Sequence, residues 1–460
     1  MMRALLIVVL GLLMHAAQQF APAAGIGSAP AATTLACGYL LLTAFLAGSL
    51  FKQFGLPKLT GYLAAGIVIG PQVLGLLTPD NVSHLRIFNG VAIALIALTA
   101  GSEMHLASMR PLMRSIAWIT LCGVLGTTVL LAVVVYFARS LLPFMAELSH
   151  NQALTLSLVL GVTMVAQSPA VVVALRDETE ADGPLIRTVL GVVVLADLVV
   201  ILMFAVVSSL AQGAFGAQTD ILETARKLFW ELFGSMGIGV VVGAFISVYL
   251  RRIKTSGALF VVAVAFVVAE VGMRMHLDPL ILALAAGMFI RNTTPFGDRL
   301  HREIEQASLP VYVAFFGVAG ATIHLDVLAS VGPAAALFVA TRAIGFQVGN
   351  RVAAARSGAP DVVRRFGGFG LMPQAGLALA LALLFTKTFP QFGASASALV
   401  FGVVALNELV APVLFRLALV KSGESGGRHR MDPGGGPTSS QEEEQEELEL
   451  EPTPVPEVAS

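Results

Sequence analysis

The chain has 460 residues, of which 56% are hydrophobic and only 12% are charged, whereas an average soluble domain has about 25% charged residues. This composition excludes an ordinary soluble protein and indicates that a lipid bilayer is the solvent. The formal net charge of −1 provides no overall field that would favour nucleic acid, so we expect no such partner.

Residues 1–32 precede the first long apolar segment. Met1-Met2-Arg3, an apolar run from Ala4 to Met14 and the small or polar residues after it favour a signal peptide. A short extra N-terminal helix is the alternative. Both interpretations place the start of the following segment outside the cell.

Mostly apolar stretches then recur as far as residue 420, and the longer ones can each cross about 30 Å of hydrocarbon as a helix. We therefore expect residues 33–420 to form an all-α polytopic membrane domain with thirteen core transmembrane helices. The expected ranges are 33–51, 60–77, 89–103, 115–138, 152–175, 187–210, 229–250, 257–274, 279–290, 308–323, 333–350, 366–386 and 394–419.

The connections between these helices differ in charge. If every helix crosses the membrane, sixteen Lys and Arg residues lie on one side and six on the other. The positive-inside rule assigns the richer side to the cytoplasm. We expect a multi-pass protein of the plasma (inner) membrane with a cytoplasmic C-terminus.

From residue 421 to 460 the composition changes to Gly, Ser, Pro and Glu, including the acidic run Gln441 to Glu451. Such a segment cannot build a core, so we predict a disordered cytoplasmic tail. It is also too short and too polar for a nucleotide-binding regulatory domain.

Two helices carry breaks. The fifth contains Thr163 and, after it, Gln167-Ser168-Pro169, while the twelfth contains a glycine cluster and Pro373-Gln374. Proline removes a backbone donor, and in lipid the freed carbonyls need a partner, so such breaks usually line a cavity or bind something.

Divided as six helices, a linker helix and six helices, the chain has its two breaks at the fifth position of each half. This spacing predicts two inverted six-helix repeats with two broken crossing helices, a pattern typical of a transporter's binding site. Two independent proline kinks are the structural alternative.

Asp197 lies halfway along the sixth helix in an apolar run with no other charge within nine residues. A charge at the bilayer centre costs about 2.5–3.5 kcal/mol on insertion scales, so the first interpretation is functional. Desolvation disfavours the ionised form, and such a carboxylate can hold either a proton or a cation. An acid kept neutral for packing is the alternative.

Arg342 in the eleventh helix is the expected charge partner of Asp197. It could balance Asp197 directly, satisfy carbonyls freed at the two breaks, or form a static salt bridge. Glu408, in the helix that corresponds to that of Asp197, is a supporting residue by one interpretation and structural by the other.

Other polar signals are more easily explained as structural. We expect Glu270 and the charges near helix ends to cap, pair or reach the interface. Asp278-Pro279 is typical of a helix start, and Gly237, Gly239 and Gly243 are typical of a helix-packing surface.

Four segments together resemble the monovalent cation:proton antiporter-2 family over roughly residues 33–419. They are the glycine-rich second helix from Leu59 to Pro71, the Ser168-Pro169 break, the helix around Asp197 and the ending Asn407 to Pro412. The ordered set is highly specific, whereas the glycine-rich helix alone is moderately so.

The resemblance implies a homodimer in which helices one to three and eight to ten form a scaffold and the remaining repeat helices form a moving core. It makes Asp197 the carrier and ligand of the proton and of Na⁺ or K⁺. Ser168, the carbonyls near Gln167, and Thr163 become candidate ligands, with Gln374 as a supporting residue.

Two departures from the family pattern bear on mechanism. Electrogenic relatives carry two adjacent aspartates, whereas this chain has Ala196-Asp197, so we expect one-for-one, electroneutral exchange. Gln167 replaces the threonine common in relatives, and the choice between Na⁺ and K⁺ stays open. We expect no cofactor.

Two other functions would use the same residues. A channel would place the buried charges in a continuous pore, and a non-transporting sensor would bind an ion at the breaks and signal through the acidic tail. Matched inverted halves favour alternating access over a channel. No intramembrane hydrolase motif is present in the sequence, so we do not expect an enzyme.

Overall fold

The structure of the chain is a computed structural model, and it describes residues 2–19, 28–85, 87–216, 226, 229–253, 257–275, 277–323, 325–374 and 376–426. In this part of the chain every regular element is a helix, as the composition predicts. Eight helical segments there are long and apolar enough to cross a membrane, or nine if the bent pair Gly297–Ile304 and Ser308–Ala321 is one span.

Four further apolar helices are shorter: Lys58–Ile69, Leu259–Gly272, Pro279–Thr293 and Leu377–Thr386. Every predicted range overlaps a helix, yet the number of thirteen crossings remains a prediction. The predicted range 60–77 is wrong at its end, because α3 stops at Ile69. Gly70 and Pro71 follow, and proline cannot continue a helix.

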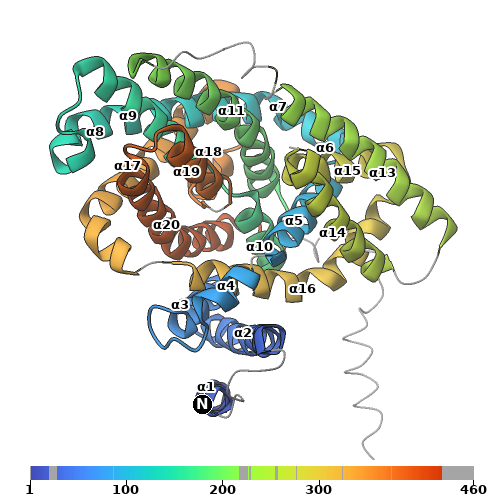
Figure 1. Cartoon of the computed structure of the whole chain (residues 1–460). Coiled ribbons are helices and arrows are strands. Elements are labelled where there is room, and N and C mark those ends of the chain that lie inside the picture. Colours follow the sequence, from blue (N-terminus) through green and yellow to red (C-terminus); the bar gives the residue numbers. More distant parts are fainter. Residues whose placement is uncertain are drawn as a thin grey trace, which may run out of the picture.

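The helices pack into two bundles (Figure 1). The scaffold bundle contains α2 (Ser28–Gln53), α3 (Lys58–Ile69), α5 (Ile87–Glu103), α13 (Ser235–Arg252), α14 (Gly257–Met275), α15 (Pro279–Thr293) and α16 (Gly297–Ala321). The core bundle contains α7 (Met113–Thr120), α8 (Gly126–Phe137), α9 (His150–Val165), α10 (Pro169–Thr179), α11 (Pro184–Ala214), α17 (Leu325–Ser357), α18 (Asp361–Gly370), α19 (Gly376–Thr388) and α20 (Gly393–Ser422).

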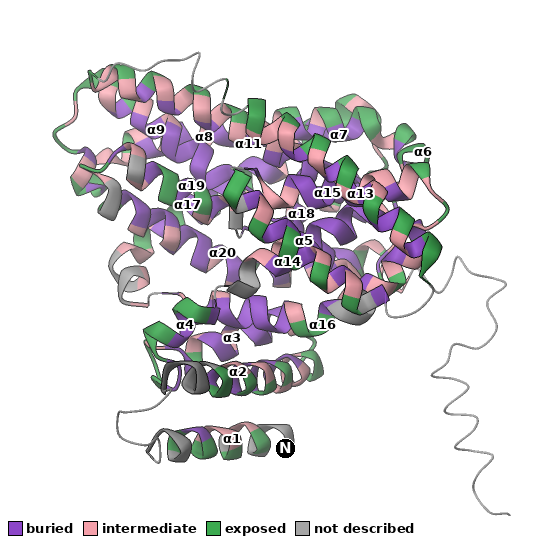
Figure 2. Ribbon diagram, turned by 45° about the vertical axis from the view of Figure 1, so that its right-hand side comes forward, coloured by how far each residue is buried: buried purple, intermediate pink, exposed green. Residues whose placement is uncertain are grey.

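Three further α-helices of the described residues lie outside both bundles: α1 (Met2–Gln19) and the short helices α4 (Pro79–Leu85) and α6 (Leu106–Met109). In Figure 1 the core bundle occupies the left and α5, α13, α14 and α15 lie on the right, with α10 between them. Buried residues line the inner faces of both bundles, while exposed residues mark the outer faces (Figure 2). The main contacts between the two bundles join α10 to α5 and α3, and α20 to α3.

Small residues allow the scaffold helices to pack backbone against backbone. A Cβ atom on Gly101 of α5 would lie 2.2 Å from the carbonyl oxygen of Leu284 in α15. Gly239 of α13 would meet the Leu282 carbonyl of α15 at 2.4 Å, whereas Gly237 faces open space. The predicted glycine packing surface is thus confirmed at Gly239 but not at Gly237.

Both predicted breaks are present. α9 ends at Val165 and α10 begins at Pro169, while α18 ends at Gly370 and α19 begins at Gly376. The residue before a proline avoids the helical region, and Ser168 accordingly has φ −132° and ψ 104°. Each broken pair directly precedes a long unbroken helix, α11 in the first half and α20 in the second.

The two ends of the chain were predicted to lie outside the membrane domain. Met2–Gln19 forms α1 and packs against α2, but residues 20–27 lie outside the described residues, and cleavage of residues 1–32 remains a prediction. Most of the predicted tail, 427–460, also lies outside them. Its first residues do not, since Glu424 accepts from the Leu185 amide at the start of α11 and the Gly426 amide donates to the Thr179 carbonyl at the end of α10.

Candidate functional site

The two helix breaks meet at the side chain of Arg342 in α17, which is completely buried. Its Nε donates to the carbonyl oxygen of Met164 at 2.6 Å, and one terminal nitrogen donates to Ala166 at 2.7 Å. The other terminal nitrogen donates to Met372 at 2.6 Å. One guanidinium therefore satisfies carbonyls that both breaks release, and its charge faces the negative C-terminal ends of α9 and α18.

A second polar group joins the same carbonyls. Gln374 donates from its side-chain nitrogen to Met164 at 2.8 Å, and its amide oxygen accepts a hydrogen bond from Asn407 at 2.7 Å. All of these side chains are buried. The sequence predicts Gln374 as a supporting residue, whereas Asn407 stands out there only as part of the segment that resembles the family. A polar residue beside Glu408 in an apolar helix was the signal that could have identified it.

Asp197 lies on α11, whose faces pack against α9 and α18. Its side chain is only 2% exposed, and neither carboxylate oxygen has a hydrogen-bond partner among the described residues. Of the arrangements considered for Arg342, the capping of freed carbonyls is the one observed. No ion pair between Arg342 and Asp197 is present in the described part of the chain.

The residues of the first break differ in how their polar atoms are used. Gln167 is 1% exposed, and both its amide oxygen and its amide nitrogen lack partners within the described residues. Ser168 caps α10 by accepting from the Val171 amide at 3.4 Å. Thr163 donates its hydroxyl to the Val159 carbonyl at 2.8 Å, so its oxygen keeps only acceptor capacity.

Glu408 is buried in α20, next to Asn407, and is only 5% exposed. Among the described residues of the core-bundle helices, two acids are buried, Asp197 and Glu408, and one arginine, Arg342. The hydrogen bonds from Arg342 to backbone carbonyls hold its charge in one position. The Asp197 carboxylate has no such partner among the described residues and is free to bind a cation. Such a carboxylate can exchange one cation for another.

The other charged residues behave as the sequence predicts. Arg274 pairs with Glu270 one helical turn away at 2.6 Å. Asp278 caps α15 by accepting from the amides of Leu280 at 2.7 Å and Ile281 at 3.2 Å. These contacts stabilise helix ends.

Comparison with known proteins places this geometry in a family. Residues 40–421 match the profile of the family described as sodium/hydrogen exchanger, transmembrane. A Na⁺/H⁺-K⁺ antiporter of Bacillus cereus, GerN, is 27% identical over 291 residues, which cover 62% of this chain and 70% of that protein. A Na⁺/H⁺ antiporter of Enterococcus hirae is 22% identical over 391 residues, covering 82% of this chain and 96% of its own length.

A solved structure shares the fold. The sodium proton antiporter MjNhaP1 of Methanocaldococcus jannaschii superposes with a TM-score of 0.63 at 14% identity, covering 88% of this chain and 100% of that chain. At this identity the likeness concerns the helical architecture.

Proposed function

The chain belongs to the transmembrane sodium/hydrogen exchanger family, and from this membership we propose that it exchanges a monovalent cation, Na⁺ or K⁺, for protons by alternating access. The observation that carries the proposal is Asp197, a buried carboxylate whose two oxygens have no partner among the described residues. The relatives' names, which include both Na⁺/H⁺ and Na⁺/H⁺-K⁺ antiporters, support the choice of ions. Transport of this kind needs no cofactor and no enzymatic step.

Competition at one carboxylate couples the two fluxes. Asp197 releases its proton on one side, binds the cation in its place, and returns with a proton from the other side. Gln167 has an amide oxygen free to accept the cation, and Ser168 and Thr163 supply further oxygens at the same break. A desolvated cation needs several such oxygen ligands to replace its water.

We further propose that the exchange is electroneutral. A proton and a monovalent cation carry the same charge, so Asp197 has the same net charge in its two loaded forms. Ala196 stands where electrogenic relatives hold a second acid. The movement itself would be a displacement of the core bundle against the scaffold bundle. We also expect two copies of the chain to pair through their scaffold bundles in the plasma membrane.

The test is exchange in proteoliposomes. Addition of Na⁺ or K⁺ to acid-loaded vesicles should alkalinise the lumen with the wild-type protein and should not do so with Asp197→Asn. Asp361→Asn is the matched control, because it removes one carboxylate from the same bundle at an exposed pair with Arg364. Exchange retained by Asp197→Asn would overturn the proposal.

A channel and a non-transporting sensor remain the competing functions, and the same vesicles separate them. A channel would pass cations with no counterflow of protons and would respond to membrane potential. A sensor would bind the cation without any flux. Collapse of the potential with a permeant lipophilic ion should leave electroneutral exchange unchanged.

A further inference from the structure

A cavity of about 190 Å³ lies between the two bundles, at the end of the membrane domain that the positive-inside rule assigns to the cytoplasm. Glu103 and His301 line it from the scaffold bundle, and Arg176 lines it from the core bundle. Its wall also includes Ile186 and Leu190 of α11.

The cavity connects the protein surface with the helix that carries the carrier residue. Arg187 and Asp298, which also line it, have side chains that are 40% and 76% exposed, whereas Ile186 and Leu190 are buried. Residues spaced by three, four or seven positions share one face of a helix. Asp197 follows Leu190 by seven residues on that face, about 10 Å further along the helix axis.

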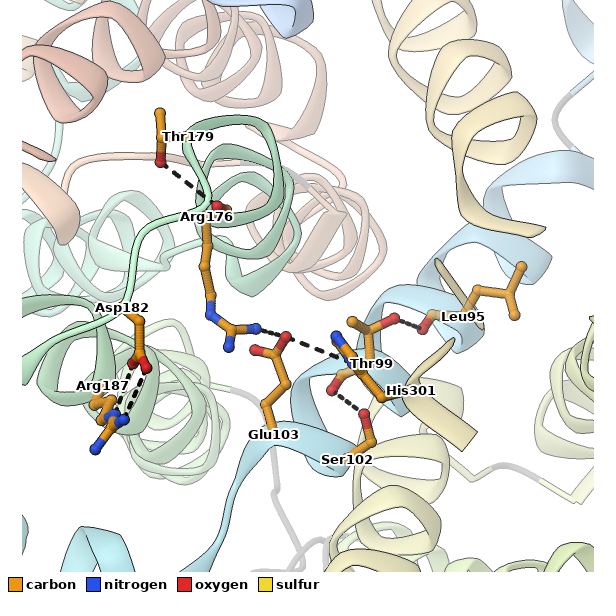
Figure 3. Close-up of polar contacts among 9 residues, drawn as sticks. All are labelled: Leu95, Thr99, Ser102, Glu103, Arg176, Thr179, Asp182, Arg187 and His301. Atoms are coloured by element: carbon orange, nitrogen blue, oxygen red, sulfur yellow. Dashed lines mark hydrogen bonds and ion pairs between the residues drawn. The ribbon is translucent and has the colours of Figure 1, made fainter. Parts of the chain in front are cut away.

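An ion pair crosses the cavity. Arg176, in the last turns of α10, pairs with Glu103 at the end of α5, and His301 of α16 lies 3.7 Å from the same carboxylate oxygen. In Figure 3 the Arg176 side chain extends from α10 toward Glu103, and His301 approaches the carboxylate from the other side. The Glu103 side chain is only 6% exposed and that of Arg176 15%, so solvent weakens this pair less than it weakens a surface pair.

The positions of both partners are fixed by their helices. Glu103 follows Gly101 by two residues, where the backbone of α5 abuts α15. The same end of α10 makes a second contact with the scaffold, since both oxygens of Glu178 accept from the Lys58 amide at 2.9 Å at the start of α3. Neither contact can survive a displacement of the core bundle along the scaffold bundle.

Other ion pairs at the cavity do not cross this boundary. Arg187 binds Asp182 within the core bundle at 2.9 Å, and Arg291 binds Asp298 within the scaffold bundle. These two pairs would move with their own bundles and stay intact. They therefore provide matched controls, because they place similar charges in the same cavity.

Taking the exchange proposed above as given, we propose that Glu103 and Arg176 form a latch that holds the core bundle against the scaffold bundle in the conformation described here. Each exchange cycle then breaks the pair and makes it again. The two are positioning residues, which set how often Asp197 faces this side of the membrane.

The first test cross-links the two latch positions, so that the core bundle cannot move away from the scaffold bundle. Glu103→Cys and Arg176→Cys are combined in a chain whose Cys37 and Cys122 are replaced by alanine. A short bifunctional thiol reagent with a cleavable disulfide should stop cation-driven proton exchange, and reduction should restore it. Full exchange by the cross-linked protein would overturn the latch, whereas failure of the wild-type protein to exchange at all would overturn the proposed function itself.

The second test uses variants that do not depend on cysteine. Arg176→Gln should raise the apparent KM for the cation on the cavity side, roughly three- to tenfold, and should lower it on the opposite side, because fewer molecules face the cavity side. Glu103→Arg combined with Arg176→Glu should restore both values. Arg291→Gln, the matched control, should leave the ratio of the two KM values unchanged. Equal changes of KM on both sides with Arg176→Gln would contradict a latch.

Discussion

Arg342 donates its Nε hydrogen to the carbonyl oxygen of Met164 at 2.6 Å, which attaches the only completely buried guanidinium among the described residues to the end of a broken helix. The break needs the arginine because its carbonyls have lost their helical partners. The arginine needs the break because a charge in hydrocarbon requires polar contacts. One consequence is that Arg342 forms no salt bridge with Asp197, whose carboxylate oxygens can therefore bind an ion.

Replacement of Arg342 should therefore destabilise the protein as well as impair transport. Arg342→Ala leaves three buried carbonyls with fewer donors, at about 1–3 kcal/mol for each unsatisfied group. We expect a marked fall of the thermal midpoint in detergent. Arg342→Lys keeps the charge but loses the planar, forked set of donors, so its thermal midpoint should lie between those of the wild-type protein and Arg342→Ala. Thermal unfolding followed by fluorescence measures the midpoints of both variants. Equal midpoints for Arg342→Ala and Arg342→Lys would contradict this account.

Removal of Asp197 should have the opposite effect on stability. The carboxylate is buried and its oxygens lack partners in the described part of the chain, so the fold bears a desolvation cost for it. Asp197→Asn should raise the thermal midpoint, by the equivalent of roughly 0.5–2 kcal/mol, while it abolishes exchange. Added Na⁺ or K⁺ should stabilise the wild-type protein and not the variant. A lower midpoint for Asp197→Asn would indicate a structural role instead.

The sequence predicts the breaks well, because Pro169 and Pro373 act on their own backbone and need no distant partner. The Asp278 cap was predictable for the same reason, since the two amides that donate to its carboxylate lie within three residues. The sequence left several arrangements of Arg342 open, the observed capping of freed carbonyls among them. It could not choose between them, because the guanidinium of α17 and the carbonyls at the two breaks meet only after packing.

Contacts between distant segments are also what sequence reasoning missed elsewhere. Glu103 was expected to pair or cap, but its partner Arg176 lies 73 positions further along the chain. The tail was expected to lie free from residue 421, yet Glu424 binds the amides of Leu185 and Ile186. A low-complexity composition describes the average of a segment and does not identify one residue that completes a folded site.

Glu424 gives the protein a contribution to stability that depends on pH. Burial raises the pKa of this carboxyl above the ordinary value of 4.5, and Asp182 adds to the effect, while the two amides and Arg187 oppose it without cancelling it. The folded state therefore binds the proton more tightly than the unfolded state. The stability from Glu424 is complete below the ordinary value and is lost as pH rises through the raised pKa.

We accordingly expect the thermal midpoint of the wild-type protein, relative to Glu424→Gln, to fall as pH rises from the ordinary value of 4.5 through the raised pKa. Ser425→Ala is the control. It removes a hydroxyl that donates to the Thr179 carbonyl at 3.1 Å in the same segment, but it removes no titrating group, so its difference from wild type should not change with pH. A wild-type midpoint that rises relative to Glu424→Gln over this range would contradict the assigned direction.

Glu408 decides whether one acid or two take part in exchange. If Asp197 alone alternates between proton and cation, Glu408 keeps one protonation state throughout the cycle, and the charge that crosses is the same in both directions. Glu408→Gln should then retain Asp197-dependent exchange, at a changed rate, and an imposed membrane potential should affect neither wild type nor variant. The measurement is the initial rate of proton efflux from vesicles with and without that potential.

If Glu408 carried a second proton, wild-type exchange would respond to the potential and Glu408→Gln would not, because the variant would have lost the extra charge. That result would replace competition at one carboxylate by a two-proton mechanism.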